Sequence, residues 1–144
     1  MAYELDHVVL WVADPVRSAA FYRDTVGLEP VRLAAYEAGE APFVSLRIGP
    51  GTLVDLVPLR LADGLNAAPG AEGSAGNKHN HVCLATTAAG FEALHARLTA
   101  GGHHVTPFAT DSFGARGTAP RTFYFADPDG NVLEARHYAE TGGR

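Results

Sequence analysis

The chain has 144 residues, enough for one compact domain or for two small halves that share a core. Its net charge of −5 argues against a general nucleic-acid-binding protein, which normally carries a basic face. No apolar stretch is long enough to span a bilayer, and the N-terminus lacks the basic and apolar regions of a signal peptide. Cys83 is the only cysteine, so no intrachain disulfide can form and a cytoplasmic protein is expected.

The first half of the chain predicts a strand, a helix and two further strands. Asp14 is typical of a helix N-cap, the helix is expected over 16–25, and Gly27 ends it. β-branched and apolar runs predict strands over 5–12, 43–48 and 52–59.

The second half repeats this order after a segment of small residues. Residues 61–78 are rich in Ala, Gly, Asn, Ser and Pro, which predicts a linker. A helix is expected over 88–99 and a loop over 111–118. Strands are expected over 81–86, 121–126 and 131–138. The chain is therefore predicted to be a single domain, 1–144, made of module 1 (about 1–60), the linker and module 2 (79–140).

The two halves match as copies of one plan. A shift of 74 positions places His7 on His81, and a shift of 79 places Asp55 on Glu134. Chance rarely aligns two histidines in opening strands and two carboxylates in closing strands. The sequence therefore predicts an α+β fold of two repeated units, each a strand and a helix followed by further strands.

Strand alternation predicts that these four polar residues share one cavity. His7, His81, Glu134 and Asp55 each point to the side of their strand opposite the helix. A lone histidine on a strand is more often a hydrogen-bonded structural residue, but equivalent positions in both halves favour ligation. Imidazoles and carboxylates suit zinc, nickel, iron(II), manganese or cobalt. We therefore expect one divalent metal ion, held by His7, His81 and Glu134, with Asp55 as a candidate fourth ligand.

Three residues are candidates for a catalytic role. Glu134 is both a ligand and a candidate catalytic carboxylate. His79 shares the cavity side of its strand with His81 and is a candidate acid–base group. Tyr124 is expected either to line the cavity or to pack with its hydroxyl satisfied.

Two motifs resemble those of the vicinal-oxygen-chelate superfamily, which includes glyoxalase, bleomycin-resistance and extradiol dioxygenase proteins. The stretch from Leu5 to Leu10, Leu-Asp-His-Val-Val-Leu, resembles their opening strand, and residues 123–134 resemble their closing signature. The resemblance implies paired βαβββ modules around a curved, open mixed-sheet cleft, often in a homodimer. It also implies metal ligation by the residues matching His7, His81 and Glu134.

The resemblance leaves several activities open. The leading expectation is a glyoxalase I-like lyase, an isomerase or an extradiol-type dioxygenase that acts on a small molecule. One alternative is a metal-free drug-binding protein of the bleomycin-resistance type. The other is a thiol transferase that resembles fosfomycin-resistance enzymes, in which Tyr124 matches a substrate-contacting tyrosine. Val9 stands where those enzymes typically offer a threonine hydroxyl, which counts against phosphonate binding.

Overall fold

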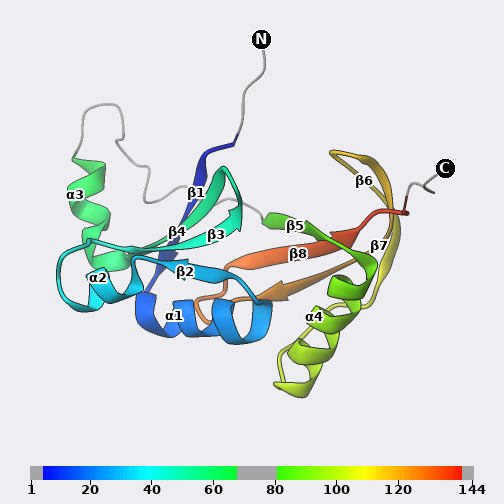
Figure 1. Cartoon of the computed structure of the whole chain (residues 1–144), viewed down its shortest axis with the longest axis horizontal. Coiled ribbons are helices and arrows are strands. Elements are labelled where there is room, and N and C mark those ends of the chain that lie inside the picture. Colours follow the sequence, from blue (N-terminus) through cyan, green and yellow to red (C-terminus); the bar gives the residue numbers. More distant parts are fainter. Residues whose placement is uncertain (1–4, 68–80, 141–144) are drawn as a thin grey trace, which may run out of the picture. The chain divides into compact units, whose positions relative to one another are not determined.

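A computed structural model of the chain describes residues 5–67 and 81–140 (Figure 1). The chain divides into two compact units, residues 1–79 (unit 1) and 80–144 (unit 2), and each contains one four-stranded sheet. Each unit has the strand–helix–three-strand order, so the predicted α+β fold of two βαβββ modules is confirmed. Among the described residues, no helix is both long and apolar enough to cross a membrane.

The sheet of unit 1 has the order β1-β4-β3-β2. Its strands are β1 (His7–Val12), β2 (Glu29–Val31), β3 (Val44–Gly49) and β4 (Thr52–Pro58). β1 runs parallel to β4, and the other neighbours are antiparallel. Helix α1 (Pro15–Phe21) packs on this sheet through buried Ala19 and Phe21, and a short helix α2 (Leu33–Glu37) precedes β3 (Figure 1).

The predicted N-cap and terminating glycine of the first helix are confirmed. The carboxylate of Asp14 accepts hydrogen bonds from the backbone N–H groups of Val16 and Arg17, which satisfies donors that the first turn leaves free. The helix continues through a π-helical turn, η1 (Tyr22–Val26). Gly27 then ends it with a φ of 90°, a left-handed conformation that a residue without Cβ adopts at little cost.

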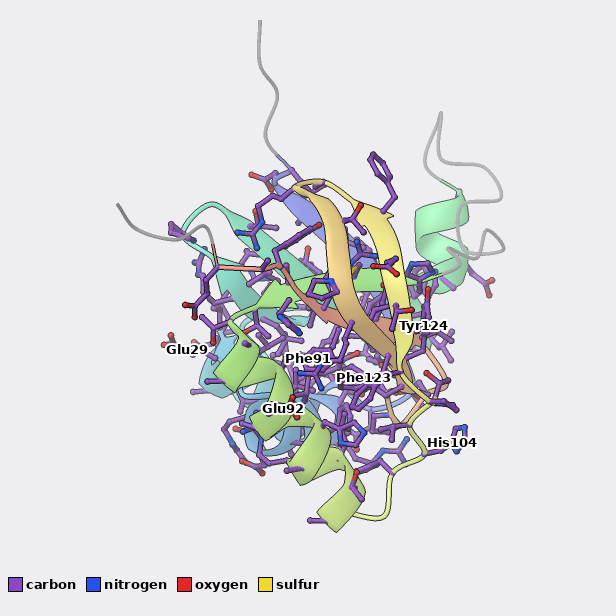
Figure 2. The ribbon with its side chains drawn as sticks, turned by 90° about the vertical axis from the view of Figure 1, so that its right-hand side faces the viewer. Glu29, Phe91, Glu92, His104, Phe123 and Tyr124 are labelled. Atoms are coloured by element: carbon purple, nitrogen blue, oxygen red, sulfur yellow. The ribbon has the colours of Figure 1, made fainter. Side chains whose placement is uncertain are left out.

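Unit 2 repeats this plan in a sheet of order β5-β8-β7-β6. Its elements are β5 (Val82–Thr86), α4 (Ala88–Ala100), β6 (Ala109–Gly114), β7 (Gly117–Ala126) and β8 (Val132–His137). Figure 2 shows Phe91 of α4 next to Phe123 of β7, and their ring centroids lie 5.0 Å apart. Leu94 and Leu98 extend this buried side of the helix, so an apolar core fixes α4 against the sheet.

The strand registers confirm the internal repeat. In unit 1, Val9 of β1 lies opposite Asp55 of β4; in unit 2, Cys83 of β5 lies opposite Glu134 of β8. The same shifts, 74 for the opening strands and 79 for the closing strands, relate the two pairs. Both carboxylates therefore occupy the same place in their sheets.

Two expectations from the sequence are wrong in detail. A 3-10 turn, η2 (Leu59–Leu61), leads into the expected linker at Leu61, and a short helix, α3 (Ala62–Asn66), occupies the beginning of it. The expected loop over 111–118 contains most of β6 and the beginning of β7, which pair as a hairpin. Both segments are exposed or rich in small and polar residues, so they lack the alternation that identifies half-buried elements.

Candidate functional site

A histidine and a carboxylate converge in unit 2. Nε2 of His81 lies 3.1 Å from Oε2 of Glu134, which is 98% buried. His81 immediately precedes β5, two residues before Cys83, the partner of Glu134 across the strand pair. Because side chains alternate along a strand, His81 and Glu134 share one face of the sheet.

The other carboxylate oxygen of Glu134 is occupied by protein groups. Oε1 accepts a 2.6 Å hydrogen bond from Nη2 of Arg136 and a second hydrogen bond from the hydroxyl of Thr122. Burial by itself raises the pKa of Glu134, but the hydrogen bonds from Thr122 and Arg136 and the charge of Arg136 lower it below its usual range. Glu134 is therefore an anion at neutral pH, with Oε2 directed at His81.

Arg136 fixes this carboxylate to the rest of unit 2. Its Nε lies 3.1 Å from the sulfur of Cys83, Nη1 donates to the carbonyl of Phe113 at 3.0 Å, and Nη2 lies 3.2 Å from the hydroxyl of Ser112. The arginine thus connects β5, β6 and β8. A buried carboxylate needs a partner of this kind, since an unpaired buried charge is strongly destabilising.

The geometry of the His81–Glu134 pair fits a metal ion. Metal–ligand bonds of about 2.0–2.2 Å place neighbouring ligand atoms roughly 3.0–3.5 Å apart. The 3.1 Å between Nε2 and Oε2 falls in this range. Hydrogen bonds to the non-ligating oxygen are the outer contacts that orient ligating carboxylates. The pair therefore offers two donor atoms for a divalent ion, and the same 3.1 Å separation equally suits a direct hydrogen bond between His81 and Glu134.

Unit 1 holds the second histidine and carboxylate. Asp55 is buried and accepts a 2.6 Å hydrogen bond from the hydroxyl of Ser45, which lies opposite it in β3. Nδ1 of His7 lies 2.6 Å from a carboxylate oxygen of Asp6, which leaves Nε2 for another partner. The hydrogen bond with Asp6 and the negative charge of Asp55 raise the pKa of His7. His7 and Asp55 both line a pocket of about 420 Å³.

The structure thus places the predicted residues as two pairs. His81 meets Glu134 in unit 2, and His7 and Asp55 border one pocket in unit 1. The described parts of the chain contain no group of three histidine, cysteine or acidic side chains arranged to hold an ion. The expected three-ligand set draws on both units and stays a prediction.

Two further predictions concern acid–base groups. His79 lies outside the described residues. The ring of Tyr124 stands edge-on to that of His81, with centroids 5.3 Å apart, and Tyr124 lies opposite Glu134 in the sheet. Burial and the charge of Glu134 raise the pKa of Tyr124, so its hydroxyl stays protonated at neutral pH.

The supporting residues were not identified from the sequence. Alternation along β8 places Arg136 on the face of Glu134, but nothing local signals that this arginine is buried. Thr122 and Ser45 become identifiable only once the register of the antiparallel neighbours is known. The roles of Thr122 and Ser45 therefore depend on contacts between distant segments and cannot be identified from the neighbouring sequence.

Comparisons with known proteins agree with this architecture. The sequence profile of the Glyoxalase/Bleomycin resistance protein/Dioxygenase superfamily matches residues 4–135, and no curated protein matches the chain. An integron cassette protein from the mobile metagenome of V. pseudocholerae is 25% identical, with a TM-score of 0.69 and coverage of 97% of this chain and 98% of that one.

Two other solved structures share the fold at lower identity. A glyoxalase/dioxygenase from Nostoc punctiforme is 20% identical, with a TM-score of 0.65 and coverage of 95% of this chain and 92% of that one. TnmS3, an antibiotic binding protein from Streptomyces sp. CB03234, is 22% identical, with a TM-score of 0.63 and coverage of 96% and 98%. The same fold therefore occurs in a glyoxalase/dioxygenase and in an antibiotic binding protein, and the fold alone does not choose between these functions.

Proposed function

Since the chain belongs to the glyoxalase/bleomycin resistance protein/dioxygenase superfamily, we propose that it is a metal-dependent enzyme acting on a small molecule. His7, His81 and Glu134 are the proposed ligands of one divalent ion, and Asp55 is a fourth candidate. The observation that carries this proposal is the 3.1 Å approach of His81 Nε2 to Glu134 Oε2, with the other carboxylate oxygen already held by Arg136 and Thr122.

The protein groups around the pair have distinct roles in this proposal. A bound divalent ion of this kind supplies Lewis-acid chemistry to substrate oxygens. Arg136 and Thr122 keep Glu134 ionised and oriented. Tyr124, protonated at neutral pH and next to the ring of His81, is the proposed hydrogen-bond donor beside the carboxylate. Lyase, isomerase and dioxygenase reactions all fit this arrangement. A homodimer and a cytoplasmic location remain part of the proposal, on the sequence resemblance and the single cysteine.

The alternative function is metal-free binding of a drug-like molecule. Two observations favour it. The negative charge of Glu134 is already balanced by the positive charge of Arg136, so the burial of this carboxylate does not depend on a metal ion. The pocket beside His7 is lined mainly by apolar side chains, and the solved structure of TnmS3 is that of an antibiotic binding protein. Such a protein would bind its ligand equally well with and without an added ion.

Metal content separates these functions. Purified protein is loaded with Mn²⁺, Fe²⁺, Ni²⁺ or Zn²⁺ in turn, dialysed and assayed for bound metal. We expect one ion per chain in the wild type and its loss in His81→Ala and Glu134→Gln. His104→Ala is the matched control, because this histidine of unit 2 is exposed and lies outside the pair. A wild type that retains none of the four ions would refute the metalloenzyme and leave the binding protein.

A further inference from the structure

The pocket beside His7 in unit 1 is formed mainly by two strands and by the segment that follows them. Its volume of about 420 Å³ lies within the roughly 300–1,000 Å³ of small-molecule sites. Its lining side chains come from β1, β4, the approach to β3, η2 and α3: His7, Val9, Pro42, Phe43, Asp55, Val57 and Leu61, with Gly64 at the wall. The expected linker therefore contributes Leu61 and Gly64 to the wall of this pocket.

The strand register gives this pocket a polar and an apolar end. β1 and β4 are parallel, with His7 opposite Leu53 and Val9 opposite Asp55, so His7 lies at the beginning of β1 and Asp55 lies in the middle of β4, before Val57. Val57 lies two residues farther along β4. β3 runs antiparallel to β4 with Val44 opposite Leu56, so Phe43 enters the sheet near Val57. The polar side chains, His7 and Asp55, thus lie toward one end of the pocket, and apolar side chains line the other end.

The apolar end has a rigid, flat wall. The guanidinium group of Arg32 lies over the ring of Phe43, 4.6 Å from its centroid, which holds the ring in place. Pro42 precedes it with a fixed backbone angle, and Leu61 of η2 adds an aliphatic surface. Rigid aromatic and proline surfaces of this kind suit a planar, apolar ligand body.

Gly64 is the unusual residue of this wall. Glycine within a helix costs about 1 kcal/mol relative to alanine. A Cβ added at Gly64 would meet no atom within 4 Å, and its φ is not in the left-handed region, so neither a close contact nor the backbone requires glycine. Gly64 is exposed and lines the pocket, so the open space beside its α-carbon lies at the rim of the pocket.

We propose that Gly64 is a specificity-determining position, at which the absence of a side chain gives the pocket room for a fused aromatic ring system. The oxygen-bearing edge of that ligand lies toward His7 and Asp55, and helix α3 (Ala62–Asn66) limits how far its body extends. Only one part of this inference rests on the proposed function, namely the ion expected near His7 and Asp55. The size limit set by α3 is a property of unit 1 by itself.

The test compares one and two aromatic rings. Binding of 2-naphthol and of phenol is measured by calorimetry and by the fluorescence of Trp11, the only tryptophan, which lies opposite Val57 in the strand pair. The variants are Gly64→Ala and Gly64→Leu. Gly49→Leu is the matched control, because a Cβ at Gly49 also meets nothing within 4 Å and this glycine does not line the pocket.

We expect Gly64→Leu to weaken 2-naphthol binding about tenfold or more while phenol binding changes little, since a filled apolar pocket rejects extra carbon atoms. Gly64→Ala should give a smaller loss, and Gly49→Leu should bind both compounds as the wild type does. The inference is overturned if the wild type does not bind 2-naphthol, or if Gly64→Leu binds it as tightly. Metal content measured on the same samples reports separately on the proposed enzyme.

Discussion

The guanidinium group of Arg136 occupies the space beside the α-carbon of Gly114, where an added methyl group would overlap Nη1. From this position the arginine donates to the carbonyl of Phe113 and to Oε1 of Glu134. The ion pair in the sheet of unit 2 therefore depends on a glycine in the neighbouring hairpin strand, and any side chain there must displace the arginine.

The first prediction concerns this glycine. Gly114→Ala should lower the free energy of unfolding by about 1–3 kcal/mol, because a displaced Arg136 leaves buried polar groups without partners. Urea denaturation measures the loss. Gly49→Ala, where a methyl group meets nothing within 4 Å, should change stability by no more than about 0.5 kcal/mol. Equal stabilities for the two variants would contradict the close approach.

The second prediction tests the ion pair itself. Arg136→Met should cost about 3–5 kcal/mol, because Glu134 would remain buried with its charge uncompensated. The double variant Arg136→Met/Glu134→Gln should recover much of that loss, since it removes both charges. A double-mutant cycle from urea denaturation gives the coupling energy. Additive losses would show that the two side chains do not stabilise each other.

The repeated plan of the fold could be predicted because it depends on local patterns. In β1, Leu10 and Val12 are buried while His7 is exposed, as the period-two alternation of a half-buried strand requires. The equivalence of Asp55 and Glu134 followed from the repeat, and the strand registers confirm it. Both carboxylates could thus be placed without knowledge of distant contacts.

The remaining features depend on contacts between segments far apart in the sequence. Phe113 of β6 is 85% exposed, so the hairpin strand has no buried face that the sequence pattern would reveal. The hydroxyl of Ser45 meets Asp55, and Arg136 meets Gly114, only because antiparallel neighbours bring them together. Side-chain alternation predicts the face of a residue but not its partner across the sheet.

The third prediction concerns the single thiol. Partial desolvation of the thiol and the charge of Glu134 raise the pKa of Cys83, although this residue is exposed, and Arg136 has the opposite effect. The thiolate is the reactive form, so alkylation by iodoacetamide should reach its half-maximal rate at a higher pH than the value of about 8.5 typical of a free thiol. Glu134→Gln should move that midpoint to lower pH, because it removes a neighbouring negative charge.

Mass spectrometry across a pH series gives these rates, with glutathione as the reference thiol. The expected order of midpoints is glutathione lowest, then Glu134→Gln, then the wild type. A wild-type midpoint at or below that of glutathione would show that the thiol is not held next to the carboxylate.

The last prediction compares the two hydroxyl groups that support the two carboxylates. Thr122→Val removes the donor to Glu134 and keeps the side-chain shape, and Ser45→Ala removes the donor to Asp55. Loss of an outer hydrogen bond to a ligand typically costs about 10- to 100-fold in metal affinity. We expect that loss in Thr122→Val, measured by competition with a chelating dye. Ser45→Ala shows a comparable loss only if Asp55 is itself a ligand, so an unchanged affinity in this variant limits the set to His7, His81 and Glu134. Unchanged affinity in both variants would instead remove Glu134 from the proposed centre, because its orientation depends on the hydroxyl that Thr122 supplies.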